Sequence, residues 1–277
     1  MTRNLGSPLD LDWIEGARGD DREPGQSRAA PPDALTLAVH CMDLTSLNDN
    51  DTPEIIQRLC EKARSAKPAS VCVFHRFVPE AVAALGDAGI PVASVAGGFP
   101  SGYPDLADRL EEIRQSVASG ADEIDAVITR SLALESDWVG LYDEIRFIRE
   151  AAGPAVLKVI LAAGDLAAPN LIARASLVAM MAGADFVKTS TGREKVNATW
   201  PIGRIMTRSV RDYAERTGFR VGFKPAGGIR TAKDAVGWIE LVATELGDEW
   251  LDPRLFRIGA SSLLADIERA LSRTDLV

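Results

Sequence analysis

The sequence predicts a (β/α)₈ barrel that forms one large domain, and three observations support this fold. From residue 35 onward, short apolar runs alternate with amphipathic stretches along the chain. Eight apolar runs occur at intervals of roughly 20 to 35 residues, a repeat that is typical of parallel strands joined by helices. The length of 277 residues also suits a single closed barrel.

The predicted strands are apolar runs, as expected for strands that are covered on both faces. They are LTLAVHCMDL (35–44), SVCVFH (70–75), PVASVA (91–96), EIDAVI (123–128), AVLKVIL (155–161), DFVKTS (185–190), FRVGFKP (219–225) and LFRIGA (255–260). An open doubly wound sheet is the alternative fold, but no GxGxxG motif follows any of these strands.

Helical periodicity fills the intervals between the strands, for example over residues 104–120 and 138–153. The tripeptide GAD occurs at residues 120–122 and again at 183–185, each time just before a predicted strand. A glycine at this position predicts the end of a helix, because glycine adopts the left-handed conformation that closes the last turn.

Residues 1–33 differ from the rest of the chain. The segment GARGDDREPGQSRAAPP (16–32) is rich in Gly, Pro and charge and has no apolar periodicity. We therefore expect a flexible N-terminal extension, followed by the catalytic barrel over residues 34–277. Within the extension only LDLDWI (9–14) has enough apolar content to dock on the barrel, and the sequence leaves open whether it does.

The composition argues against several classes of protein. A net charge of −9 and a pI near 4.9 disfavour binding to nucleic acid or to anionic membranes. No apolar run reaches the roughly 18 residues needed to span a bilayer, and no signal peptide is evident. The three cysteines, Cys41, Cys60 and Cys72, lack CxxC spacing, which favours a reducing compartment. We expect a soluble cytoplasmic protein.

Four charged residues lie in or at the ends of predicted strands, where a core would not accept them unpaired. Asp125 lies in EIDAVI, Lys158 in AVLKVIL, Lys188 at the end of DFVK and Lys224 at the end of VGFK. A single lysine of this kind would be interpreted as a strand-end side chain that extends its amine to solvent. Three lysines and an aspartate on four adjacent strands instead predict a cluster at the mouth of the barrel.

This cluster allows two kinds of chemistry. A lysine with an ordinary pKa of about 10.4 is unprotonated in only about one molecule in 2,500 at pH 7. Burial and a second ammonium lower that pKa, so two lysines and a carboxylate suit a Schiff-base site. Alternatively, all the lysines stay charged and bind an anion. The spacing of the residues does not separate these two possibilities.

A phosphate site is predicted in the loops after the last two strands, the usual position in this fold. The glycines in KPAGGIRTAKD leave backbone N–H groups free, and GASS precedes a helix whose N-terminus favours an anion. Ordinary turns and helix capping are the structural alternative. The candidate residues are Gly227, Gly228, Gly259, Ser261 and Ser262.

Three other polar residues carry weaker signals. His40 lies in an apolar run and is interpreted as a core histidine, whereas His75 ends a predicted strand, where lining the mouth is the less favoured of its possible roles. Asp43 precedes LTSLNDND, where a site role and a capping role are equally compatible with the pattern. Two distant histidines argue against a zinc site, and no GxSxG motif indicates a serine hydrolase.

The segments DFVKTSTG, VGFKPAGGIRTA, RIGASSLL, DLTSL and DEIDAVI together closely resemble the deoxyribose-phosphate aldolases. LDLDWI, ASVAGGFPSG and DEWLDPRLFRIGASSLL are similar to the animal-type branch of that family, and the resemblance covers residues 35–271. It implies a metal-free class I aldolase, a lyase without a cofactor. The implied reaction converts 2-deoxyribose 5-phosphate to glyceraldehyde 3-phosphate and acetaldehyde in deoxyribonucleoside catabolism.

The resemblance also implies the role of each residue. Lys188 corresponds to the Schiff-base lysine, Lys224 to the lysine that lowers its pKa, and Asp125 to the aspartate that moves protons with a water. Lys158 matches a lysine beside that aspartate, and Asp43 is expected to support the site. The positions that match the phosphate site are Gly192, Gly227, Gly228, Gly259, Ser261 and Ser262, with Arg193 beside them.

Two departures from the family pattern matter. Arg193 replaces the Lys that often follows KTSTG, so phosphate binding should survive with altered geometry. Many members end in a flexible tail whose terminal tyrosine helps proton transfer, whereas this sequence ends in RTDLV and has only Tyr103, Tyr142 and Tyr213. We therefore expect slower proton exchange at the acetaldehyde methyl group.

Three alternative functions remain to be compared with this one. They are a Schiff-base aldolase for a ketose phosphate, a non-catalytic protein that binds phosphorylated metabolites, and a barrel isomerase. The isomerase would require a Glu or His base at a strand end. The non-catalytic hypothesis predicts that a lysine or the aspartate of the cluster is lost, whereas Lys188, Lys224 and Asp125 are all present. The expected partners are the phosphorylated sugar and acetaldehyde, with neither nucleic acid nor membrane, and the expected assembly is a homodimer.

Overall fold

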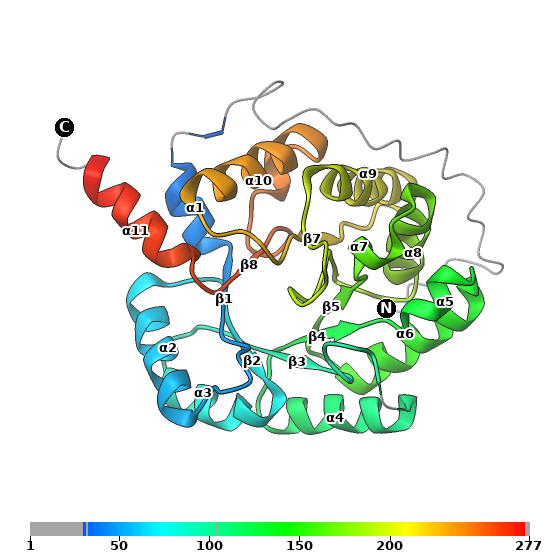
Figure 1. The fold of residues 1–277 in the computed structure, drawn as a ribbon, viewed down its shortest axis with the longest axis horizontal. Helices are drawn as coiled ribbons and strands as arrows, with labels where there is room; N and C mark the ends of the chain where they lie inside the picture. The colour runs from blue at the N-terminus through cyan, green and yellow to red at the C-terminus, as the bar shows by residue number, and fades with distance from the viewer. Residues whose placement is uncertain (1–29, 32, 104, 275–277) are drawn as a thin grey trace.

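The computed structural model describes residues 30–31, 33–103 and 105–274, and it confirms the (β/α)₈ barrel (Figure 1). Eight parallel strands form one sheet in the order β7-β6-β5-β4-β3-β2-β1-β8. Parallel bridges from Phe223 to Phe256 and from Ala226 to Gly259 join the chain around β7 to the chain around β8. These bridges close the sheet into a barrel.

The strands are short, because each contributes only the part of the chain that lines the barrel. Their bounds are β1 Met42–Thr45, β2 Ser70–Phe74, β3 Val92–Ala96, β4 Glu123–Val127, β5 Val156–Ile160, β6 Phe186–Lys188, β7 Gly222–Lys224 and β8 Ile258–Ala260.

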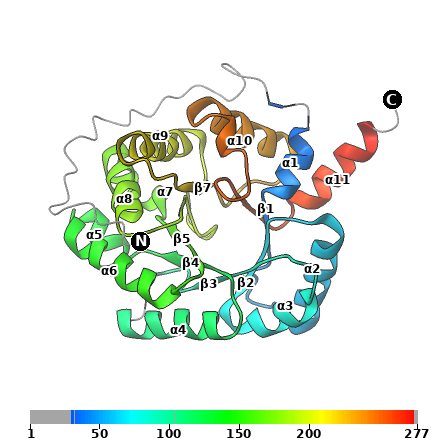
Figure 2. The same cartoon turned by 180° about the vertical axis from the view of Figure 1, so that it is seen from behind.

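Helices surround the barrel as an outer ring (Figure 2). They are α1 Ala34–His40, α2 Pro53–Ala66, α3 Val78–Leu85, α4 Leu106–Ala118, α5 Arg130–Leu134, α6 Trp138–Ala152, α7 Ala163–Leu166, α8 Pro169–Met181, α9 Trp200–Thr217, α10 Ala232–Glu245 and α11 Leu263–Thr274. Two 3₁₀ turns, η1 His75–Phe77 and η2 Asp248–Trp250, complete the described elements. None of these helices is long and apolar enough to cross a membrane.

The first predicted strand is wrong over most of its length. Residues Ala34–His40 form helix α1, and only Met42–Thr45 forms a strand. The short apolar run fits either structure, since the buried Ala34, Ala38 and Val39 also lie on one face of a helix. That face packs against α10 and α11 (Figure 1). His40 is exposed at the end of α1, so its interpretation as a core histidine is also wrong.

The two GAD glycines end helices as predicted, and threonine caps that the sequence analysis did not single out begin three others. Gly120 and Gly183, the glycines of the two GAD segments, have φ of +100° and +106° just before β4 and β6. Thr52 and Thr199 act as N-caps with a proline in the first turn of the helix, and Thr231 forms a capping box with Asp234. Each signal satisfies backbone groups that the helix itself leaves unpaired.

The apolar core lies between the strands and the ring of helices. The three cysteines are free thiols within the buried part of the fold. LDLDWI and most of the predicted flexible extension lie outside the described residues. At the end of the extension, the backbone N–H of Ala30 donates a hydrogen bond to the side chain of Glu240 on α10.

Candidate active site

The four charged residues that the sequence singled out converge inside the barrel. In the register of the sheet, Asp125 pairs with Lys158, and Lys188 pairs with Lys224. All four side chains are buried, with an exposed fraction of 3% or less for each residue. Since successive residues of a strand point to opposite faces, these positions all direct their side chains to the barrel interior. The predicted cluster is confirmed.

Asp125 lies at the centre of this cluster and accepts a hydrogen bond from each lysine. Its Oδ2 atom accepts from Lys188 Nζ at 2.7 Å and from Lys224 Nζ at 2.6 Å. Its Oδ1 atom accepts from Lys158 Nζ at 2.9 Å. One carboxylate is therefore shared by three amines, which brings the two lysines on β6 and β7 close together.

Burial and neighbouring charges affect the three lysines differently. Burial lowers the pKa of Lys188, and the nearby ammonium of Lys224 lowers it further, which together outweigh the attraction of Asp125. Burial also acts on Lys224, but attraction to Asp125 and Asp43 outweighs it and raises the pKa of Lys224. Burial likewise opposes the charge of Lys158, whose pKa is raised by Asp125, Glu123 and Asp43. Lys188 is thus the lysine of the three whose neutral form is favoured.

The carboxylates of the cluster stay ionised. Burial alone would raise the pKa of Asp125, but the adjacent Lys158, Lys188 and Lys224 hold it well below its usual range. The pKa of Asp43 is also held well below its usual range, because Lys224, Lys158 and Arg257 together outweigh the effect of burial. A carboxylate that remains charged stabilises the positive charge of the basic side chains around it.

Asp43 lies in the same buried cluster and caps no helix, so its capping interpretation is wrong. It is fully buried within β1, where Oδ2 accepts a short hydrogen bond from Lys224 and Oδ1 accepts one from Arg257 at 2.6 Å. The helix cap after β1 is Thr52 instead. His75 lies in η1 with its Nε2 atom 3.8 Å from Glu112, and it is not among the residues that line the cavity.

Two buried charges in the same region were missed by the sequence reasoning. Glu123 begins β4, and Arg257 lies just before β8. Arg257 donates to both oxygens of Glu123, at 2.8 and 3.0 Å, and Lys158 donates to Glu123 at 2.5 Å. The sequence did contain a signal for both residues. Glu123 and Arg257 are charges within predicted apolar strands, which is the criterion that selected Lys158.

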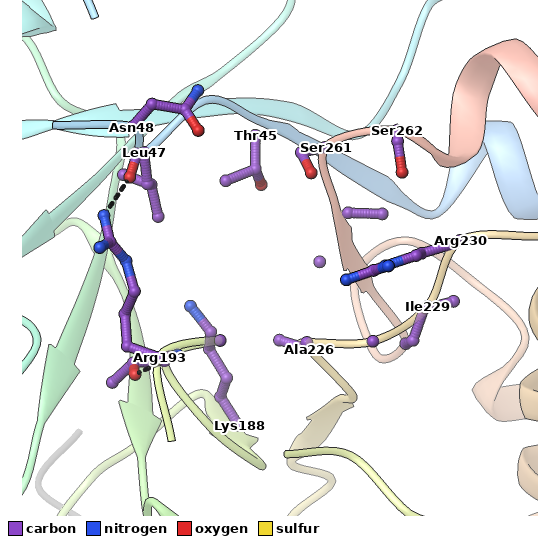
Figure 3. Close-up of a pocket in the computed structure, with 16 residues that line it drawn as sticks. Thr45, Leu47, Asn48, Lys188, Arg193, Ala226, Ile229, Arg230, Ser261 and Ser262 are labelled. Carbon is purple, nitrogen blue, oxygen red and sulfur yellow. Dashed lines mark hydrogen bonds between the residues drawn. The ribbon is translucent and has the colours of Figure 1, made fainter. Parts of the chain in front are cut away.

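A cavity of about 230 Å³ lies next to Lys188, at the carboxyl ends of the strands (Figure 3). Of the three clustered lysines, Lys188 is the one that lines it, and its amine points into the space between Arg193 and Ala226 (Figure 3). Lys158 and Lys224 are fully buried and do not line the cavity. A substrate in this cavity would therefore meet the amine with the lowered pKa.

All seven residues of the predicted phosphate site line this cavity. They are Gly192, Arg193, Gly227, Gly228, Gly259, Ser261 and Ser262. Arg230, which the sequence reasoning missed, also lines it and extends its guanidinium across the opening opposite Arg193 (Figure 3). Its place directly after the Gly-Gly-Ile of the loop after β7 was the available signal.

The glycines of the cavity have different physical roles. Gly227 and Gly228 have φ of +84° and +85°, and no described residue accepts a hydrogen bond from their backbone N–H groups. A Cβ atom at Gly227 would lie 2.7 Å from the Cβ atom of Asn197. Gly259 instead donates to Pro225, and a Cβ atom there would lie 2.9 Å from Ala226 and 3.2 Å from Lys224. Gly259 therefore leaves room for the second lysine.

The loop after β6 is held by an internal carboxylate. Glu194 accepts hydrogen bonds from the backbone N–H groups of Thr191 and Gly192, at 3.0 and 3.2 Å through Oε2. Arg130 donates to the other oxygen of Glu194 at 3.1 Å. Arg193 donates to the carbonyl of Leu47 at 2.6 Å, which ties this loop to the loop after β1 (Figure 3). One wall of the cavity is thereby preorganised.

A parallel barrel with a buried amine of lowered pKa beside an aspartate, open to a cavity at the carboxyl ends of its strands, defines the class of barrel aldolases that react through a lysine. Among the described residues, no group of His, Cys, Asp and Glu side chains is placed to hold a metal ion.

Comparison with known proteins identifies the family. The chain belongs to the DeoC/LacD family of aldolases, whose model matches residues 37–269. It is 50% identical to the deoxyribose-phosphate aldolase of Bos taurus, over 96% of this chain and 93% of the relative. A crystal structure from Coccidioides immitis matches with a TM-score of 0.76 at 28% identity over 88% of each chain. The tetrameric deoxyribose phosphate aldolase of Aeropyrum pernix matches with a TM-score of 0.69 at 28% identity, over 88% of this chain and 93% of its own.

Proposed function

We propose that this aldolase cleaves 2-deoxy-D-ribose 5-phosphate to D-glyceraldehyde 3-phosphate and acetaldehyde through a Schiff base on Lys188. One observation carries the assignment of the reacting residue. Among the three lysines that share Asp125, Lys188 is the one that lines the cavity and the one whose pKa is lowered. The identity to the bovine deoxyribose-phosphate aldolase supports the choice of substrate.

The reaction begins at the amine. Neutral Lys188 attacks C1 of the open-chain aldehyde, and Asp125, 2.7 Å from the amine, passes protons so that the carbinolamine loses water and an imine forms. Lys224 stays charged, held by Asp125 and Asp43, and its ammonium disfavours a proton on Lys188 before the attack.

Cleavage then uses the imine as an acceptor of electrons. The C3 hydroxyl passes its proton through a water to Asp125, the C2–C3 bond breaks, and its electron pair forms the enamine while glyceraldehyde 3-phosphate leaves. Protonation of the enamine at C2 and attack of water on the imine release acetaldehyde and regenerate the Lys188 amine. Asp125 is the carboxylate that contacts the free amine, at 2.7 Å.

The opposite end of the cavity suits the 5-phosphate. The backbone N–H groups of Gly227 and Gly228, the N-terminus of α11 after Ser261 and Ser262, and Arg230 are all favourable to an anion. Binding energy from a phosphate held there would orient the sugar so that its aldehyde meets Lys188.

Borohydride trapping tests this function. Reduction in the presence of acetaldehyde should leave a stable ethyl adduct on Lys188, located by peptide mapping. The adduct should be absent in Lys188→Met and retained in Lys195→Met, which removes an exposed lysine from the same loop. A protein that binds deoxyribose 5-phosphate but forms no adduct would be a non-catalytic binding protein. Trapping with a ketose phosphate, and not with acetaldehyde, would instead indicate a ketose aldolase.

We also propose that the chain forms a homodimer. We further propose that it acts in the cytoplasm, in deoxyribonucleoside catabolism. Val139 and Phe147 on α6 are 63% and 49% exposed, and their spacing of eight residues places them on one side of the helix. Leu134 on the neighbouring α5 is 49% exposed. Light scattering of the purified protein, compared with Phe147→Glu, would test this assembly.

The free, buried thiols support a reducing compartment, as in the cytoplasm.

A further inference from the structure

Arg257 and Glu123 form a buried ion pair one layer below the reacting groups. Glu123 precedes Asp125 by two residues on β4, so both side chains point into the barrel. Arg257 likewise precedes Gly259 by two residues, and its guanidinium lies 5.5 Å from the ring centre of Phe186. Neither residue lines the cavity, so neither contacts a substrate there.

The charges in the barrel interior are balanced only when one cation is neutral. The cluster contains three carboxylates, those of Asp43, Glu123 and Asp125, which form ion pairs with the side chains of four basic residues. Since a net charge in a buried site is costly, the proton that is easiest to lose belongs to the cation with the fewest carboxylate partners. The four basic residues are Lys158, Lys188, Lys224 and Arg257.

Lys188 has the fewest of these contacts. Lys158 lies within 3.5 Å of all three carboxylates, and Lys224 contacts both Asp43 and Asp125. Arg257 contacts Asp43 and both oxygens of Glu123. Among the described carboxylates Lys188 contacts only Asp125, and it shares the accepting oxygen with Lys224.

We propose that Arg257 and Glu123 are positioning residues that distribute the buried carboxylates, so that Lys188 is left as the uncharged amine. The proposal rests on the assignment of Lys188 as the Schiff-base residue. Arg257 holds Asp43 Oδ1 while Lys224 is held between Asp43 Oδ2 and Asp125 Oδ2. Glu123 draws Lys158 at 2.5 Å, shorter than the 2.9 Å from Lys158 to Asp125.

The two residues should act in opposite directions. Without Arg257, Asp43 would attract Lys224 more strongly. Asp125 Oδ2 would then be left to Lys188, which would stabilise the ammonium form of Lys188. Without the charge of Glu123, Lys158 would depend on Asp125 and Asp43, which would leave less negative charge for Lys188. The titratable and charged groups around Lys188 that bear on this balance are Asp43 on β1, Cys72 on β2, Asp125 on β4, Lys158 on β5 and Lys224 on β7, with Arg193 and Arg230 at the cavity.

The test is the pH dependence of kcat/KM for deoxyribose 5-phosphate cleavage in four variants, with the trapped adduct mapped in each. Activity should rise with pH as Lys188 becomes neutral, and the midpoint of this acid limb is the readout. Arg257→Gln should move the midpoint up by about one pH unit, and Glu123→Gln should move it down by a similar amount. The double variant should lie near the unmodified protein. Arg254→Gln, which removes an exposed arginine paired with Asp252, should leave it unchanged.

The outcomes separate this inference from the proposed function. If the adduct maps to Lys188 but the midpoint stays fixed, or if both single variants move it in the same direction, the pair has only a structural role and the inference is wrong. If Arg257→Gln does not fold, as judged by its melting curve, the isosteric Glu123→Gln decides alone, by the presence or absence of the downward shift. If no adduct forms on Lys188 in the unmodified protein, the proposed function fails and the inference falls with it.

Discussion

Lys188 and Lys224 donate hydrogen bonds to the same carboxylate oxygen, Oδ2 of Asp125, over 2.7 and 2.6 Å. Two amines that share one acceptor compete for its negative charge, so a proton on one disfavours a proton on the other. Lys224 has a second partner in Asp43, whereas Lys188 has none of this kind among the described residues. This difference explains how two adjacent lysines acquire opposite pKa shifts.

Replacing Lys224 with leucine should therefore impair the reaction without removing its nucleophile. The ammonium that lowers the pKa of Lys188 would be lost, and Asp125 would be left more available to Lys188. We expect the acid limb of the pH profile of kcat/KM to move up by at least about one unit. Lys62→Leu, at an exposed position of α2, is the matched control. An unchanged profile in Lys224→Leu would contradict the tuning role.

The buried aspartates should make stability depend on pH on the acid side. The folded-state pKa values of Asp43 and Asp125 lie below the value of about 3.9 in an unfolded chain. Their contribution is therefore fully present above about pH 4 and is lost as the pH falls further, since the unfolded chain then binds more protons. The free energy of unfolding in urea, measured between pH 3 and 7, would show this fall.

Asp125→Asn should lower the stability at neutral pH and weaken that acid dependence. Removing one partner of a buried ion pair leaves uncompensated charge and costs about 3–5 kcal/mol. Asp87→Asn, which removes a carboxylate that is 96% exposed and paired with Arg64, should change the free energy of unfolding by less than about 1 kcal/mol. Equal losses in the two variants would show that the Asp125 cluster does not stabilise the fold.

Gly227→Ala should weaken binding of the phosphorylated substrate while leaving the Schiff base intact. The substitution strains a residue with φ of +84° and brings a methyl group to 2.7 Å from Asn197. We expect KM to rise by about 10- to 100-fold, as for the loss of charged hydrogen bonds, and trapping by acetaldehyde to be unaffected. Gly89→Ala controls for strain alone, because Gly89 has φ of +67° with no atom within 4 Å. A similar KM in both variants would argue against phosphate binding at this turn.

Arg230→Gln should reduce affinity for phosphate itself. Its guanidinium lines the cavity opposite Arg193, so its removal should raise the inhibition constant of inorganic phosphate by about tenfold or more. The effect should diminish at high salt, because the contact is partly exposed. Lys233→Gln, an exposed cation three residues later, should leave the inhibition constant unchanged. Equal inhibition in both variants would mean that Arg230 does not bind the anion.

The sequence predicted the barrel because the alternation of strands and helices is a local property. It can be recognised from the spacing of apolar residues and from the glycines at helix ends. It also located Asp125, Lys158, Lys188 and Lys224, since a charge in an apolar strand is conspicuous without any knowledge of its neighbours. It was wrong where a local pattern fits two structures. Residues Ala34–His40 form a helix although their apolar run also suits a strand, and the choice depends on packing against α10 and α11.

The amino-acid sequence by itself thus determined the fold, four of the clustered charges and the loops after β7 and β8 that line the cavity. Only the tertiary structure decided which lysine faces that cavity, that Asp43 is a buried partner of Lys224, and that Arg257 and Glu123 form a pair beneath them. The physical reason is that a pKa depends on burial and on the distances to other charges. Those charges come from β1, β4, β5, β7 and the residue before β8, which lie far apart along the chain and meet only when the barrel closes.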